Sequence, residues 1–339
     1  MNRRRILVAV LVLVVAALAG LFWRNSHRET PVAQPPAAQS APTQHIVVNE
    51  ALRTLLYIPI YHAKQRGYFK DAGLDVEIVT GGTATAAFSA MLNGEADFAV
   101  ADPMYVPISQ QKGSDTRVIA QIVARIAVWG VAKDAGLPAN DSAALKGRKI
   151  STHQRPMTAY TYAVKTLREA GLDPEKDVTL ITGAPGSELA AFNSGEAEVM
   201  FSLEPNTSRA MLKGAKLIRS FPADLGDQVF TGLMTRGDVL TGKRAAAVAL
   251  VRGIQRAMDD LQANPEAALA TAKVFFPQVE EDVIKAAMKR LVDEQVMPKT
   301  IAISAASWDK AVKVRVEAGD LQKAFTVSES CDFTLIPPR

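Results

Sequence analysis

The sequence predicts an α/β protein of two similar lobes, each a mostly parallel sheet flanked by helices, joined by two crossover segments. One observation is an internal repeat, because "NGEADFAVADP" at residues 93–103 returns as "NSGEAEVMFSLEP" at residues 193–205. A second is that strand-length and helix-length segments alternate around both copies. A third is that two apolar segments with strand character, residues 124–133 and 221–236, stand where the chain would pass between lobes.

The repeat extends backwards, and each copy reads strand, helix, strand, helix, strand, helix, strand. "AGLDVEIVTGG" at residues 72–82 aligns with "AGLDPEKDVTLITGA" at residues 170–184. Strand-like runs include 45–49, 76–79, 116–123, 147–151, 178–181 and 215–221, of which 76–79 and 178–181 are rich in β-branched residues. Helical patterns precede the second strands at 61–71 and 158–169. Strands that alternate with helices of this length pair in parallel in a three-layer unit.

Local signals support the helix ends. Gly73 and Gly171 stand where a helix needs a residue with positive φ to end it. Thr83 or Thr85 in the first copy, and Ser187 in the second, are candidate caps for the next helix.

The crossovers divide the chain into expected domains. We expect a first part of lobe one at residues 46–128, lobe two at 129–228, and the return to lobe one with C-terminal helices at 229–339. One apolar face of the tail at residues 243–264 has helical spacing, which predicts helices that buttress lobe one. Its members are Val248, Val251, Ile254, Met258 and Leu261.

The first 45 residues predict export. Three arginines precede an apolar run at residues 6–23, and a Pro/Ala-rich tether follows at residues 24–45. Residues 1–23 fit a signal peptide cleaved near Ala17-Leu18-Ala19, and they fit equally a retained transmembrane anchor. Either alternative places the body on the periplasmic side of the inner membrane.

Composition excludes several classes of function. Residues 1–45 hold five arginines and one glutamate, so the totals of 39 basic and 35 acidic residues leave a balanced 34 and 34 in the rest, which argues against nucleic-acid binding. Cys331 is the one cysteine, so no disulfide framework or cysteine metal site is possible. The four histidines lack metal-ligand spacing, and no nucleophile elbow or phosphate loop is present. We therefore expect neither a cofactor nor an enzyme.

Two facing α/β lobes create a ligand cleft at the carboxyl ends of their strands. Each loop there has a structural and a ligand-binding interpretation. Residues 81–85 are a helix cap or an anchor for an anionic or carbonyl group, and Asp102 and Glu204 cap helices or accept hydrogen bonds from a ligand. Tyr57 and Tyr105 pack internally or stack on a flat ring. At the mouth of lobe two, His153 and Arg155 bind an acid group or form a solvated rim.

"IPIYHAKQRGYFKDAGLDVEIVTGG" at residues 58–82, followed by "NGEADFAVADP" and later by "LKGRKIS", "AGLDPEKDVTLI" and "LEP", resembles a known family. These motifs are similar to the substrate-binding proteins of ABC importers, in the group that binds sulfonates, taurine, nitrate and a thiamine-precursor pyrimidine. The resemblance implies a type II periplasmic binding protein. Leu203 departs from the family, in which many relatives carry an aromatic residue there.

The resemblance also implies a function. The chain would be a monomer that captures a small organic molecule, heteroaromatic or sulfonate-like, by hinge closure and delivers it to an ABC permease with its ATPase. Alternatives are a pyrimidine-synthesis enzyme on the same scaffold and a membrane-tethered periplasmic ligand sensor. The residue pattern and the resemblance together give ten candidate ligand-binding residues: Tyr57, Pro59, Gly82, Thr83, Asp102, Met104, Tyr105, His153, Arg155 and Glu204.

Overall fold

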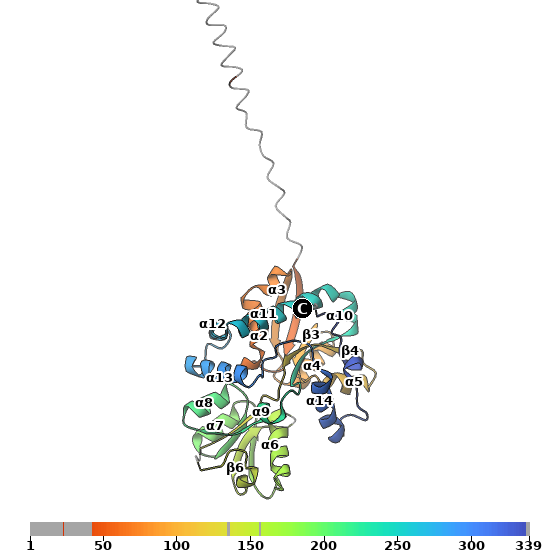
Figure 1. The fold of residues 1–339 in the computed structure, drawn as a ribbon. Helices are drawn as coiled ribbons and strands as arrows, with labels where there is room; N and C mark the ends of the chain where they lie inside the picture. The colour runs from red at the N-terminus through yellow and green to blue at the C-terminus, as the bar shows by residue number, and fades with distance from the viewer. Residues whose placement is uncertain (1–22, 24–42, 134–135, 156, 337–339) are drawn as a thin grey trace, which may run out of the picture. The chain divides into compact units, whose positions relative to one another are not determined.

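The computed structural model describes Trp23 and residues 43–133, 136–155 and 157–336 (Figure 1). The predicted signal peptide or anchor, and nearly all of the predicted tether, therefore lie outside the described residues. Within those residues, no helix combines the length and the apolar character that crossing a membrane requires.

The body contains two five-stranded sheets with the same strand order. Lobe one has the order β2-β1-β3-β10-β4, and lobe two has β7-β6-β8-β5-β9. The strands of lobe one are β1 (Gln44–Glu50), β2 (Leu74–Thr80), β3 (Phe98–Ala101), β4 (Thr116–Val123) and β10 (Thr231–Arg236). Those of lobe two are β5 (Trp129–Ala132), β6 (Lys149–His153), β7 (Thr179–Gly183), β8 (Val199–Ser202) and β9 (Lys216–Ser220). The internal repeat thus corresponds to two copies of one sheet topology.

Each sheet holds one antiparallel strand, and in both cases it is the strand that arrives from the other lobe. β5 runs antiparallel to β8 and β9, and β10 runs antiparallel to β3 and β4. The four repeated strands of a lobe end at the cleft, whereas a strand entering from the other lobe starts at the cleft, so its direction is reversed. The predicted fold class of two mostly parallel lobes is confirmed, with this reversal at both crossovers.

Helices cover both faces of each sheet. In lobe one, α2 (Ile58–Gln65), α3 (Tyr68–Asp71), α11 (Arg244–Ala263), α12 (Ala267–Phe275) and α13 (Glu281–Asp293) pack on one face. The other face carries α4 (Ala84–Leu92), α5 (Tyr105–Gln110) and α14 (Ala305–Glu317). In lobe two, α6 (Thr158–Glu169) covers one face, and α7 (Ser187–Ser194) and α8 (Asn206–Leu212) cover the other. The predicted face of α11 is buried except at Val248, which is partly buried.

The remaining helices are short and stand at the edges of the lobes. They are η1 (Leu55–Tyr57), η2 (Ser142–Leu145), α9 (Phe221–Leu225), α10 (Gly237–Gly242) and α15 (Val327–Ser330). Of these, η1 follows the carboxyl end of β1 after a four-residue loop, at the end of the sheet where a ligand is expected.

Backbone geometry confirms some of the predicted helix ends and corrects others. Gly73 and Gly171 have φ of 74° and 75°, as a helix stop requires. Thr83 caps α4 by accepting a hydrogen bond from the amide of Ala86. The prediction for Ser187 is wrong, because α7 is capped by Gly186 in the left-handed region. The helix expected at 61–71 is two helices, since Gly67, with φ of 77°, breaks it.

Candidate functional site

A cleft of about 470 Å³ lies where the strand ends of both lobes meet, a volume within the range of small-molecule sites. Its walls are mostly apolar and come from both lobes and from the C-terminal tail. The apolar lining includes Leu52, Leu56, Tyr57, Ile108, Met157, Leu203 and Phe230. A molecule bound there would contact both sheets.

The lobe-one wall is formed by the loop after β1 and by η1. Thr54 caps η1 by accepting from the amide of Leu56, and its hydroxyl donates to the carbonyl of Glu204 in lobe two at 3.3 Å. Tyr57 is buried, and this burial raises the pKa of its hydroxyl, so the group remains a neutral hydrogen-bonding group. This wall therefore reaches across to the other lobe, and those of its residues that line the larger cleft are uncharged.

The start of α4 adds a second stretch of lobe-one wall. Gly82 has φ of 82°, which makes the tight turn into the helix possible, and Thr83 follows as the cap. The hydroxyls of Thr85 and Tyr105 lie 2.7 Å apart, and the Tyr105 ring packs on Phe88. These residues present hydroxyl groups beside an otherwise apolar surface.

The lobe-two wall is the loop between β6 and α6. Met157 is the N-cap of α6, and its side chain accepts no hydrogen bond from the first turn, so among the described residues no side chain caps the first amides of this 12-residue helix. Thr158 and Ala159, in the first turn, line the cleft. Arg155 lies beside them with its guanidinium 4.9 Å from the centre of the Tyr160 ring. This wall is the part of the cleft best suited to an acid group.

His153 lies deeper than the sequence indicates. It is 2% exposed, and its Nε2 is 3.4 Å from Oε1 of the buried Glu188. Glu188 also accepts hydrogen bonds from Ser202, Asn206 and the amide of Gly186. Burial opposes the charge on Glu188, but His153 and these donors outweigh it and lower the pKa of the carboxyl to about 2. His153 thus has an internal partner behind the inner wall.

Asp102 reaches the cleft as part of an ion pair. Its Oδ1 accepts from the amide of Met104 at 2.9 Å, and its Oδ2 accepts from Arg315 of α14. Arg315 also contacts Asp320 at 3.1 Å, and all three charged side chains line the cleft. The charge of Asp102 raises the pKa of the Arg315 guanidinium, so Arg315 stays charged.

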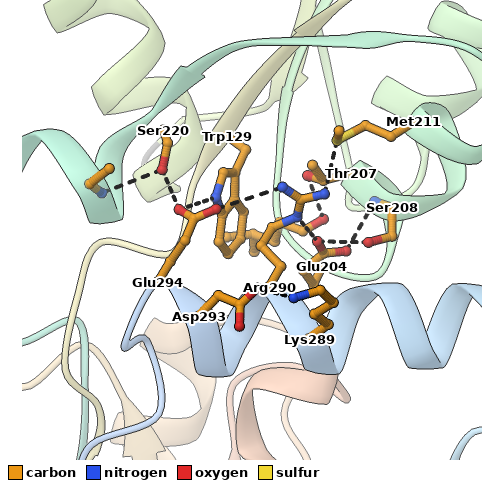
Figure 2. Close-up of polar contacts among 12 residues, drawn as sticks. Trp129, Glu204, Thr207, Ser208, Met211, Ser220, Lys289, Arg290, Asp293 and Glu294 are labelled. Atoms are coloured by element: carbon orange, nitrogen blue, oxygen red, sulfur yellow. Dashed lines mark hydrogen bonds and ion pairs between the residues drawn. The ribbon is translucent and has the colours of Figure 1, made fainter.

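Glu204 faces a smaller neighbouring cavity of about 250 Å³. Its carboxylate accepts from Arg290 at 2.8 Å and from the amide and hydroxyl of Ser208 at 3.0 and 2.9 Å (Figure 2). Burial raises the pKa of Glu204, and Arg290 and Ser208 oppose that rise. The two cavities share Leu52, Thr54, His153, Pro185 and Leu203.

The structure gathers most of the candidate residues and separates three of them. Seven line the larger cleft: Tyr57, Gly82, Thr83, Asp102, Tyr105, His153 and Arg155. Pro59 is buried in α2, Met104 is buried in the lobe-one core at 3% exposure, and Glu204 belongs to the smaller cavity. Which of them contact a ligand stays a prediction.

Sequence reasoning missed the lining residues that come from outside the repeat. They are Phe230, Thr231, Arg315 and Asp320. Arg315 is separated from Asp102 by 213 positions. No local motif marks such residues, because only the path of the C-terminal tail brings them to the cleft.

Comparison with known proteins places the chain in a family. A model of the family described as "NMT1/THI5 like" matches residues 56–268. The putative binding protein YtlA of Bacillus subtilis is 24% identical over 283 residues, which cover 82% of this chain and 84% of YtlA.

Solved structures with the same fold include a binding protein and an enzyme. The alkanesulfonate-binding protein SsuA from Xanthomonas axonopodis pv. citri, bound to MOPS, has a TM-score of 0.66 at 18% identity, covering 85% of this chain and 98% of SsuA. The desulfurization enzyme DszB has a TM-score of 0.66 at 12% identity, covering 86% and 97%. Identities this low show a shared fold, that of type II periplasmic binding proteins, and leave the chemistry open. The family model covers more than half of the chain, and the chain therefore belongs to the NMT1/THI5-like family.

Proposed function

We propose that this chain is the exported substrate-binding protein of an ABC importer and that it captures a small organic molecule with an acid group, such as a sulfonate. One observation carries this function: a cleft of 470 Å³, apolar in most of its lining, has the uncapped start of α6 and Arg155 on one wall. An organic body suits the apolar walls, and the acid group suits the amides and the guanidinium. SsuA, which has the same fold, was solved with the sulfonate MOPS.

A heteroaromatic ligand rich in amino groups fits these contacts less well. Its N–H groups would need free acceptors, and the carboxylate of Asp102 already accepts from Arg315 and Met104. Glu204 is satisfied by Arg290 and Ser208 in the smaller cavity. These contacts favour a sulfonate-like ligand over a pyrimidine.

Capture would occur by hinge closure. Two crossovers, leading into β5 and β10, join the lobes, and the cleft is lined from both sides. A ligand that contacts both walls favours the closed form, because only this form makes both sets of contacts. The predicted export segment supports capture in the periplasm. The family supports delivery to a membrane permease that is driven by an ATPase.

An enzyme on the same scaffold is the main alternative, since DszB is an enzyme with this fold. Within the described cleft, two titratable groups already have charged neighbours: Nε2 of His153 lies 3.4 Å from Glu188, and Asp102 pairs with Arg315. Nδ1 of His153 is buried without a hydrogen-bond partner among the described residues. Cys331 does not line the cleft, and burial raises the pKa of its thiol to about 12, so it is a poor nucleophile. We therefore propose binding rather than catalysis.

A thermal-shift panel tests the function. MOPS, taurine, an aromatic sulfonate and an aminopyrimidine would be added to the purified protein, and native mass spectrometry would identify any ligand retained from the cell. A true ligand should raise the melting temperature saturably, by the equivalent of about 2.7 kcal/mol at a hundredfold excess over Kd. A shift with the pyrimidine alone would overturn the ligand class, and release of sulfite from a sulfonate would favour an enzyme.

A further inference from the structure

Helix α13 lies between the two lobes, although it follows lobe one in the chain. Its apolar face, with Ile284, Ala287 and Leu291, is part of the lobe-one core. Its other side contacts α8 of lobe two. Figure 2 shows Arg290 and Glu294 reaching from this helix and its end toward lobe-two residues.

Arg290 makes the central contacts. The side chain is 14% exposed, and its Nε donates to Glu204, whose side chain is fully buried. Its Nη2 is 2.9 Å from the sulfur of Met211, and its guanidinium lies 5.9 Å from the centre of the Trp129 ring. One side chain of the tail thus contacts β5, α8 and the turn between β8 and α8.

Glu294 adds a contact with the end of β9 in lobe two. Its carboxylate accepts from the indole of Trp129 at 2.9 Å and from the hydroxyl of Ser220 at the end of β9. It also lies 3.6 Å from Arg290, which orients both side chains. These contacts together join one helix to most of the cleft-facing edge of the lobe-two sheet.

One of these contacts ends next to the inner wall of the ligand cleft. Glu204 sits in the turn at residues 203–206, and Leu203 in the same turn lines the cleft. The carbonyl of Glu204 accepts from Thr54 of lobe one. Separating the lobes at this edge would therefore expose Trp129, break the Arg290 contacts and move the ligand wall.

We infer that α13 is a latch between the lobes in which Arg290 is a positioning residue, holding the turn at 203–206 and keeping this edge of the cleft closed without ligand. Opening then occurs at the other edge, and a widely open form is a minor state. This inference rests on the proposed function and deepens it. The latch limits how far the two lobes separate without ligand, and so how far they move when a ligand closes them.

The distance between the lobes tests the latch without any ligand. Spin labels at Lys112→Cys and Lys213→Cys, two exposed and repeat-related positions, would be measured by pulsed electron paramagnetic resonance in a full chain carrying Cys331→Ala. The parent should give one narrow distribution of distances. Glu204→Met with Arg290→Met removes both charges together, and should add a longer distance whose population rises about tenfold or more above a minor state of roughly 0.1–10%.

A matched control lies on the same helix. Lys289 and Asp293 form an exposed ion pair on α13, so Lys289→Gln with Asp293→Asn should leave the distribution unchanged. A parent-like distribution in the Glu204→Met/Arg290→Met protein, or equal widening in the control, overturns the latch. If that double variant does not fold, Arg290→Lys, which keeps the charge and loses the planar fork, should widen the distribution, and an unchanged one overturns the inference. Failure of every ligand in the thermal panel would not affect this result.

Discussion

Asp102 and Glu204 occupy the same position in the two halves of the repeat and have different surroundings. Each follows the third strand of its lobe, precedes a proline and pairs with an arginine of the C-terminal tail. The Asp102 side chain is 20% exposed and lines the larger cleft, whereas the Glu204 side chain is fully buried. The repeat places a carboxylate at each strand end, and the tail, which lies outside the repeat, determines what the carboxylate contacts.

The glutamate side chain is one methylene group longer than the aspartate side chain, and this difference agrees with the contacts that each carboxylate makes. Asp102 reaches the amide of Met104, two positions on, with one oxygen and Arg315 with the other. Glu204 reaches Ser208, one helical turn on, and still has an oxygen directed at Arg290. The lobe-one carboxylate therefore lines the ligand cleft, and the lobe-two carboxylate belongs to the contact between lobes.

The largest expected effect comes from breaking the buried pair on one side. Arg290→Met should lower the free energy of unfolding by about 3–5 kcal/mol, because it leaves the buried carboxylate of Glu204 without its charge partner. Urea unfolding followed by circular dichroism measures the loss. Glu204→Met with Arg290→Met should recover most of the stability, and a double variant as unstable as the single one would contradict an uncompensated charge as the cause.

A second contrast concerns pH and two buried carboxyls of lobe two. The pKa of Glu188 is lowered to about 2, so its contribution is complete above the unfolded value of 4.5 and is lost as pH falls toward 2. The loss amounts to about 3 kcal/mol from the pKa difference. Glu204 has the opposite sign: its raised pKa means that its ionisation weakens the fold as pH rises through that value.

Unfolding by urea between pH 2 and pH 7 separates the two carboxyls. Glu188→Gln should flatten the acid limb of the stability profile below pH 4.5, and Glu204→Gln should leave that limb in place. Equal acid limbs in the parent and the Glu188→Gln protein would show that the hydrogen bonds from Ser202 and Asn206 do not hold Glu188 ionised.

Much of the fold follows from local pattern, and the confirmed parts show why. The strand at 116–123 and the helix at 158–169 have the bounds that their sequences predict, because β-branched runs and helical periodicity are local properties. Gly73 and Gly171 mark helix ends because a positive φ is needed there, and their matching places in the two copies of the repeat can be seen in the sequence. The break at Gly67 was missed, since a single glycine inside a helical pattern does not reveal its φ.

The candidate site was predicted less well, for a physical reason. Strand-end loops such as the one holding Thr83 follow from topology, and they do line the cleft. The charges around Asp102 and Glu204 depend on Arg315 and Arg290, whose positions depend on the packing of the tail over the whole lobe. His153 resembles an exposed loop residue in the sequence, but it ends strand β6, and its ring is buried against Glu188 of α7.

A smaller effect is expected at the mouth of the cleft. Arg155→Met should weaken the binding of a sulfonate ligand about tenfold, or about 1.4 kcal/mol, and should leave the melting temperature of the free protein within about 1 °C. Arg155 is exposed and its guanidinium packs on the Tyr160 ring, so we expect little stability to depend on it. Isothermal titration calorimetry measures the affinity, and Arg252→Met on α11, remote from the cleft lining, is the matched control. Equal affinities in the two variants would remove Arg155 from the site.

The smallest expected effect returns to Asp102 and decides between its two roles. Asp102→Asn keeps the size of the side chain and removes the charge that balances Arg315, so the guanidinium should attract an anionic ligand more strongly and raise its affinity a few-fold, while stability changes by less than about 1 kcal/mol. Glu204→Gln should leave the affinity unchanged, because Arg290 does not line the larger cleft. Titration calorimetry and urea unfolding of both variants measure the contrast. A fall in affinity with Asp102→Asn would instead mean that the carboxylate accepts a hydrogen bond from the ligand, in which case the two carboxylates differ in burial and only Asp102 takes part in recognition.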